Sequence, residues 1–192
     1  TLVWIEAIDH PVEPKGGTIQ SLIYQIQPYE LALKDEIRIG IRYDRQIKDM
    51  PNTSLYYYNQ KSGWTFLPTI NLPNRMVMAG TLLSFDAIGI IQDTDPPFVR
   101  KVYPANGGNF HYKDVRTISV IADDYLSGIS SDEQTMSMTL DGEPVRYAFQ
   151  PLKKELYYYL PTPLNTGEHT VEYSLSDQAG HQVSGSTTFR VD

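Results

Sequence analysis

The amino-acid sequence predicts an all-β protein that consists of two β-sandwich domains in tandem. Three observations predict this fold class. Apolar and polar residues alternate along most of the chain, turn residues recur at short intervals, and no segment has the apolar periodicity of a long amphipathic helix. The length of 192 residues suits two domains, each with its own small core.

The first half of the chain contains the clearest alternating segment, residues 36–43. Ile37, Ile39 and Ile41 share one face of this predicted strand and charged residues share the other, so we expect the three isoleucines in the core of the first domain. Four further strands are predicted in this half, at residues 18–27, 54–59, 64–67 and 82–91.

Aromatic residues cluster in two runs of three tyrosines, 56–58 and 157–159. Neighbouring tyrosines on a strand face opposite sides, which favours core and cross-strand packing. The alternative is that the outward-facing members bind a glycan. Trp64 directly follows a hairpin glycine, and we predict that it packs inward beside Tyr57 or the Ile37 strand.

The segment from Asp93 to Pro97 marks the domain boundary. It ends in two adjacent prolines, which stiffen the backbone and prevent a strand from continuing. We place the border after Asp95, which gives domains at residues 1–95 and 96–192.

The second half contains about seven predicted strands at the spacing of an immunoglobulin-like sandwich. Asp141-Gly142 and Asn165-Thr166-Gly167 supply turn residues between them. The strands are predicted at residues 98–103, 115–122, 135–140, 144–149, 155–160, 168–176 and 182–191. The core of this domain is predicted to include Val120, Leu140, Val171 and Tyr173.

Composition excludes several classes of function. The chain has no cysteine and a net charge of −7, which excludes thiolate chemistry and disfavours nucleic acid and anionic membranes. No apolar run is long enough for a membrane helix. Thr1 does not begin a signal peptide, so we expect an excised part of a larger protein that is extracellular, periplasmic or attached to the cell surface.

The sequence predicts no catalytic residue. The four histidines have neither the helical spacing of a metal site nor a neighbouring carboxylate in a ligand pattern, and His169 is interpreted as a strand-edge residue. No nucleophile motif is present. Asp123 and Asp124 are adjacent on an extended segment and would point in opposite directions, unlike the carboxylates of a glycosidase. The histidines are His10, His111, His169 and His181.

Five motifs in the second half resemble bacterial immunoglobulin-like domains. They are DTDPP from Asp93, DDYLSGI from Asp123, DG at Asp141, LNTGEHT from Leu164 and SDQAGH from Ser176. The last motif ends in histidine where that family usually has asparagine.

The first half is similar to a module that precedes such domains in secreted bacterial proteins, including some M23-type metallopeptidases, and more loosely to ZU5-like sandwiches. The matching pieces are YQIQP from Tyr24, IGIRY from Ile39, LYYY from Leu55 with Trp64, and Ser84-Phe85. The ZU5-like resemblance does not extend to autoproteolysis, because the His-Phe-Ser cleavage motif is absent.

These resemblances imply a non-catalytic accessory, spacer or docking region of a secreted or surface-anchored bacterial protein. Its partner would be the remainder of the parent protein, or a cell-envelope glycan or protein. Two alternatives stay open: a carbohydrate- or peptidoglycan-binding module, and the cleft-shaping C-terminal part of a metallopeptidase.

No cofactor is expected from the sequence, with one alternative. In an immunoglobulin-like topology, several aspartates would converge near the domain junction, where carboxylates can bind calcium. The competing interpretation is that each aspartate accepts hydrogen bonds within its own turn. The candidate residues are Asp93, Asp95, Asp123, Asp124 and Asp177.

Overall fold

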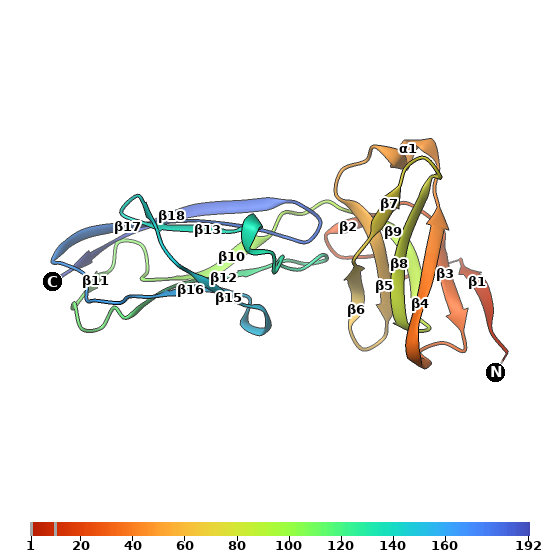
Figure 1. Cartoon of the computed structure of the whole chain (residues 1–192), viewed down its shortest axis with the longest axis horizontal. Coiled ribbons are helices and arrows are strands. Elements are labelled where there is room, and N and C mark those ends of the chain that lie inside the picture. The colour runs from red at the N-terminus through yellow and green to blue at the C-terminus, as the bar shows by residue number, and fades with distance from the viewer. Residues whose placement is uncertain (1, 10) are drawn as a thin grey trace. The chain divides into compact units, whose positions relative to one another are not determined.

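The computed structural model describes residues 2–9 and 11–192 and contains two compact units (Figure 1). One unit comprises Thr1–Asp95 with Tyr125–Ser127, and the other comprises Pro96–Asp124 with Gly128–Asp192. Nearly all regular structure is β, which confirms the predicted fold class of tandem β-sandwich domains.

The first unit is built from two antiparallel sheets. One has the strand order β1-β3-β9-β5-β6, with β2 also paired to β9, and the other has the order β4-β8-β7. The strands are β1 (Trp4–Ile8), β2 (Gly17–Ile19), β3 (Ile23–Gln27), β4 (Ala32–Arg42), β5 (Thr53–Asn59), β6 (Gly63–Leu67), β7 (Ile70–Leu72), β8 (Val77–Ser84) and β9 (Ala87–Asp93).

The main core of the first unit contains buried residues from both sheets. Ile41 is buried, and Ile37 and Ile39 pack against the same cluster, as the alternation of this strand predicts. Leu55 and Ile90 are fully buried in it. The predicted core face of this segment is therefore confirmed.

One predicted strand, residues 82–91, is in fact two strands that belong to different sheets. The chain leaves β8 at Ser84 and enters β9 at Ala87. Between them, the backbone N–H of Phe85 donates to Leu31, and the Phe85 carbonyl accepts from Glu30. These bonds satisfy the backbone where the chain crosses between sheets, a change that alternation does not reveal.

Trp64 packs inward, as the sequence predicts, but against the buried cluster that contains Tyr56 and Ile91, and not beside Tyr57 or the Ile37 strand. It is paired across the β5–β6 hairpin with Tyr58, so the two side chains share a face, and their ring centroids are 5.3 Å apart. Tyr57 points to the opposite face, toward the main core. The indole N–H of Trp64 donates to the carbonyl of Val12 at 2.7 Å.

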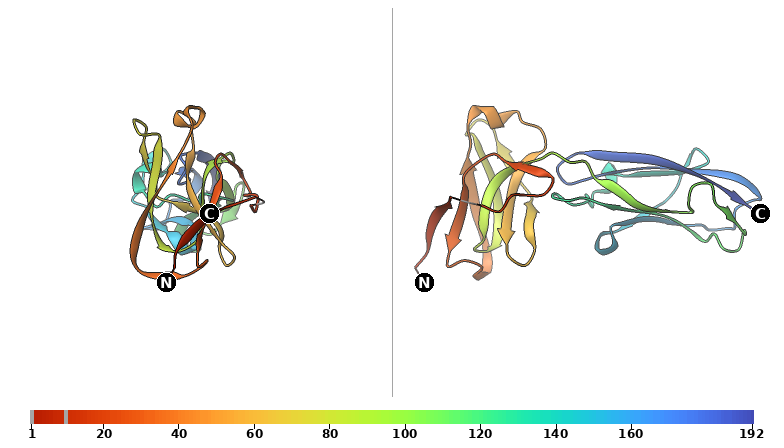
Figure 2. Two further views of the ribbon diagram at one scale, coloured as in Figure 1. Left: turned by 90° about the vertical axis from the view of Figure 1, so that its right-hand side faces the viewer. Right: turned by 180° about the vertical axis from the view of Figure 1, so that it is seen from behind.

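The second unit is also a two-sheet sandwich. One sheet has the order β10-β12-β16-β15 and the other the order β11-β18-β17-β13-β14. The long hairpin of β17 and β18 is drawn in blue in Figure 2. The strands are β10 (Phe98–Tyr103), β11 (Asn109–Phe110), β12 (Thr117–Asp123), β13 (Ser137–Leu140), β14 (Glu143–Pro144), β15 (Ala148–Gln150), β16 (Glu155–Tyr159), β17 (Gly167–Ser176) and β18 (Gln182–Val191).

The core of the second unit confirms the residues that the sequence predicts. Val120 and Val171 are fully buried, Tyr173 is buried, and Leu140 packs against them. The predicted strand at residues 144–149 is divided, because β14 pairs with β13 in one sheet and β15 pairs with β16 in the other.

Helical structure is confined to short segments in the described part of the chain. A single helical turn, α1 (Arg45–Lys48), follows β4, and two 3₁₀ turns lie in the second unit, at Glu133–Thr135 and Pro151–Lys153. None of the helices in the described residues has the length and apolar character needed to span a membrane.

Candidate metal centre

The aspartates considered for calcium lie in different settings. Asp93 and Asp95 belong to the first unit, where Asp93 is buried at the end of β9 and accepts a hydrogen bond from the Asp95 backbone N–H. Asp123, Asp124 and Asp177 belong to the second unit. These three are also in different environments.

Asp123 is neutralised by cations of its own unit. It forms salt bridges with Arg100, at 3.2 Å, and with Lys154. Burial alone would raise the pKa of Asp123, but hydrogen bonds from Lys154 and the Asp124 backbone, with the two positive charges, hold that pKa below its usual value. This carboxylate therefore already has its counter-ions.

Asp177 organises the loop that joins β17 to β18. Its Oδ1 accepts the backbone N–H groups of Gly180, at 2.7 Å, and His181, at 2.8 Å. Gly180 has a φ of 103°, a conformation that favours glycine. The loop also docks against the preceding segment, since the Gln178 N–H donates to the Gly128 carbonyl. The loop is thus held in one shape.

The imidazole of His181 lies directly on this carboxylate. Its Nδ1 is 3.1 Å from Asp177 Oδ2. The Asp177 side chain is fully buried, whereas that of His181 is 21% exposed. When Nδ1 donates to Asp177, Nε2 carries the ring's lone pair. A carboxylate that holds an imidazole in this way is the common support of a metal-ligating histidine.

A second buried carboxylate is close to the pair. Asp124 is buried and its Oδ1 accepts the Gly128 N–H at 2.8 Å. Burial, with the negative charge of Asp124, raises the pKa of Asp177, despite the hydrogen bonds from Gly180 and His181 that lower it. The negative charge of Asp124 therefore reaches Asp177, which itself holds the imidazole of His181.

His169 is held differently and is not a strand-edge residue. It is buried in β17, with Nδ1 2.7 Å from Asp141 Oδ2 and Nε2 2.8 Å from the Asn165 carbonyl. Both ring nitrogens face acceptors, so both donate. Burial alone would lower the pKa of His169, but these two partners raise it above its usual value. These contacts favour the protonated ring and leave neither nitrogen directed at a metal.

The remaining two histidines are weaker candidates for a metal ligand. His111 is exposed, and its Nδ1 accepts the Lys113 N–H at 3.3 Å. His10 lies outside the described residues. The sequence analysis does not identify His181 as a candidate metal ligand, because the helical spacing of paired metal ligands is absent there. The signal was the aspartate four residues earlier, since a tight β-hairpin loop also brings positions i and i+4 together.

Comparison with known proteins gives one family match. The model of the CopC domain matches residues 120–192, which is less than half of the chain and includes the Asp177–His181 loop. No match was found among the curated proteins.

Solved structures similar to this chain include CopC from Methylosinus trichosporium OB3b, at 20% identity and a TM-score of 0.40, covering 50% of this chain and 93% of that chain. PcoC, a methionine-rich copper resistance protein from Escherichia coli, has 17% identity and a TM-score of 0.41, covering 51% and 100%. Dimeric latent PorU from Porphyromonas gingivalis has 10% identity and a TM-score of 0.37, covering 89% and 21%.

The CopC match corrects three predictions from the sequence. The resemblance to a ZU5-like module and to regions beside M23-type peptidases is wrong, because the match is to a copper resistance domain with an immunoglobulin-like sandwich. The interpretation as an accessory spacer, with its glycan-binding and cleft-shaping alternatives, is wrong for the same reason. The expectation of no cofactor, with calcium as the candidate ion, conflicts with the copper binding of the CopC family.

Proposed function

We propose that the second unit binds copper as cargo, at the loop between β17 and β18, with His181 as the imidazole ligand. The observation that carries this proposal is the CopC match over residues 120–192, which contains the loop. Asp177 is the positioning residue, because it holds the ring through Nδ1 and accepts the backbone N–H groups of Gly180 and His181.

The donor set suits Cu(II). Imidazole nitrogen and carboxylate oxygen are ligands that Cu(II) accepts, whereas Cu(I) prefers thioether and thiolate sulfur. The chain has no cysteine. Met136 and Met138 are only 6% and 2% exposed, inside the core of the second unit. Their sulfur atoms support the sandwich and do not face the loop's surface.

We further propose that the chain acts outside the bacterial cytoplasm, in the periplasm or at the cell surface. The match to a copper resistance domain supports this compartment. The proposed role is binding and carrying the ion, and it assigns no catalytic step to the residues of this chain.

The test is a titration with Cu(II) near neutral pH, followed by calorimetry and by electron paramagnetic resonance. His181→Asn is the decisive variant, because it removes the imidazole while the backbone N–H of residue 181 still donates to Asp177, so the turn should keep its shape. We expect the affinity for Cu(II) to fall at least tenfold and the nitrogen hyperfine signal of the bound ion to change.

His111→Asn is the matched control, because His111 is exposed and lies outside the loop. This variant should bind Cu(II) as the unmodified chain does. If His181→Asn and His111→Asn bind Cu(II) with the same affinity and the same spectrum, His181 is not the ligand and the proposal fails.

A further inference from the structure

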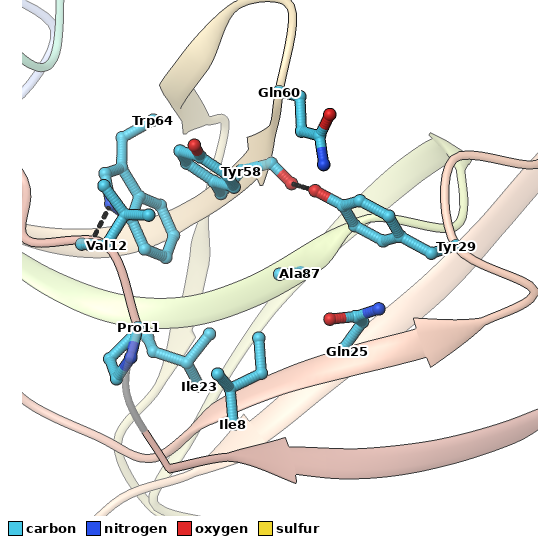
Figure 3. Close-up of a pocket in the computed structure, with 10 residues that line it drawn as sticks. All are labelled: Ile8, Pro11, Val12, Ile23, Gln25, Tyr29, Tyr58, Gln60, Trp64 and Ala87. Atoms are coloured by element: carbon cyan, nitrogen blue, oxygen red, sulfur yellow. Dashed lines mark hydrogen bonds between the residues drawn. The ribbon is translucent and has the colours of Figure 1, made fainter.

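The first unit contains an aromatic pocket that the proposed copper site does not use. It lies on the sheet that contains β3, β5, β6 and β9, and its volume is about 230 Å³. Figure 3 shows Trp64 and Tyr58 together on one side, Tyr29 on the other, and Ala87 between them. Gln25 and Gln60 add polar groups at the rim.

The hydrogen-bond donors of these aromatic residues already have partners inside the protein. The indole N–H of Trp64 donates to the Val12 carbonyl at 2.7 Å. The Tyr29 hydroxyl donates to the Tyr58 carbonyl at 3.1 Å, and both bonds are drawn in Figure 3. These contacts hold the rings in place. The pocket therefore presents ring surface to a ligand, with few donors directed inward.

The charges around the pocket are negative. No Lys or Arg is among the described residues that line it. The Glu30 carboxylate accepts the Gln60 N–H at 2.9 Å, and the buried Asp86 immediately precedes Ala87. Burial, and then the charges of Glu30 and Asp86, raise the pKa of Tyr29 to about 12.

Ring surface combined with negative charge is the environment that attracts an organic cation. The face of an aromatic ring is electron-rich and attracts ammonium groups, and alkylated ammonium ligands are recognised in this way. The volume equals that of roughly seven or eight water molecules in the liquid. It is smaller than the sites that hold drug-sized ligands, so a head group fits better than an extended molecule.

We propose that the pocket formed by Tyr29, Tyr58 and Trp64 binds the alkylated ammonium head group of a small organic cation. The trimethylammonium group is the simplest such ligand, because its methyl groups would contact the rings and its charge would be favoured by the Glu30 carboxylate, which is bonded to the backbone of the lining residue Gln60. This inference is independent of the copper site, which belongs to the second unit.

The experiment compares choline with its neutral carbon isostere, in which a tert-butyl group replaces trimethylammonium. Binding to the full chain is measured by ligand-observed NMR and calorimetry. We expect saturable binding of choline that is at least tenfold tighter than binding of the isostere. Equal binding of the two would show a merely apolar pocket, and no saturable binding of choline or tetramethylammonium would also overturn the proposal.

Variants locate the site. Trp64→Leu should abolish choline binding, and Glu30→Gln, at an exposed position, should weaken it severalfold without loss of fold. Tyr29→Phe keeps the ring and should retain binding. Tyr159→Leu removes a 69% exposed aromatic side chain of the second unit and is the control. Unchanged binding in both Trp64→Leu and Glu30→Gln would place the ligand elsewhere.

Two sources of the head group are distinguished by adding vesicles. Co-flotation of the chain with phosphatidylcholine vesicles, but not with phosphatidylglycerol vesicles, would assign the pocket to a lipid head group. Binding of free choline without co-flotation would assign it to a small solute. Either result supports recognition of the ammonium group.

Discussion

The β17–β18 hairpin supplies the histidines of two imidazole–carboxylate pairs that are built in opposite ways. At His169, both ring nitrogens face acceptors, Asp141 and the Asn165 carbonyl. At His181, the organising group is the buried Asp177, which accepts two backbone N–H groups and the ring. The first arrangement holds a proton on the ring, and the second fixes a loop and orients the ring.

A histidine and an aspartate thus have different roles in the two pairs, because the groups around each pair differ. A histidine with two acceptors is stabilised as a cation and adds to the stability of the fold. A histidine oriented by one carboxylate is suited to bind a metal through its other nitrogen. This comparison predicts that substitutions at the His169 pair lower the stability of the fold, and that substitution of His181 lowers the affinity for copper.

The largest effect on stability is expected for Asp177→Ala. The change leaves the N–H groups of Gly180 and His181 without their acceptor in a part-buried loop that is docked against the sandwich, and losing the acceptor of such donors is costly. We expect the free energy of unfolding to fall by about 3 kcal/mol in urea titrations. The exposed Asp114 is the control, and Asp114→Ala should change it by less than about 0.5 kcal/mol.

Asp177→Asn is the milder companion of this variant. It keeps an oxygen for the two N–H groups but places an uncharged amide beside the imidazole. We expect most of the stability to remain and the affinity for Cu(II) to fall by about 10- to 100-fold, the usual effect of losing a supporting carboxylate. A Cu(II) affinity equal to that of the unmodified chain would show that Asp177 has no role beyond the loop.

Asp141→Ala should have the next largest effect on stability. Asp141 accepts from the His169 ring and from the Thr170 N–H, at 2.8 Å. Losing two hydrogen bonds, one of them to a charged ring, should lower the free energy of unfolding by about 2 kcal/mol near pH 6. Copper affinity should not change, and a clear loss of Cu(II) binding in this variant would contradict the separation of the two pairs.

The stability that the His169–Asp141 pair contributes should depend on pH, and this effect is smaller than the loss of the pair. The pKa of His169 is raised in the folded chain, so the folded state binds this proton more tightly than the unfolded state. The resulting stabilisation is fully present below the unfolded pKa and is lost as the pH rises through the raised value. The stability difference between the unmodified chain and Asp141→Ala should therefore shrink from pH 5.5 to pH 8.5. A difference that grows over this range would exclude the protonated ring.

Strand alternation predicts the fold well because burial of one face is a local property of the sequence. Ile37, Ile39 and Ile41 are found where their spacing places them, as are Val120 and Val171. What alternation does not reveal is a change of sheet where the alternating pattern continues. At Phe85, between the polar residues Ser84 and Asp86, the chain passes from one sheet to the other, so one strand is predicted where two exist.

The candidate site was predicted less well, because its geometry depends on a loop. In the sequence, the segment from Asp177 to His181 belongs to a motif that resembles bacterial immunoglobulin-like domains, and its histidine is a departure from that family. The Asp177 carboxylate was considered for calcium, but its partner was not recognised, because a hairpin loop brings the two side chains together without helical spacing. Trp64 shows the same limit, since the register of a hairpin decided which tyrosine it meets.

The smallest effect on stability is expected for His181→Asn, and it makes the sharpest comparison with His169→Asn. At position 181 the backbone N–H still donates to Asp177, and the asparagine amide can also donate to this carboxylate, so the free energy of unfolding should change by less than about 0.5 kcal/mol. At position 169 the same substitution removes a buried ring that contacts Phe189, with centroids 5.8 Å apart, and both of its hydrogen bonds. We expect a loss of about 2 kcal/mol there, with unchanged Cu(II) affinity.

Urea unfolding and copper titration of the two variants measure both quantities. If His169→Asn loses copper and His181→Asn loses stability, the roles assigned to the two histidines are reversed.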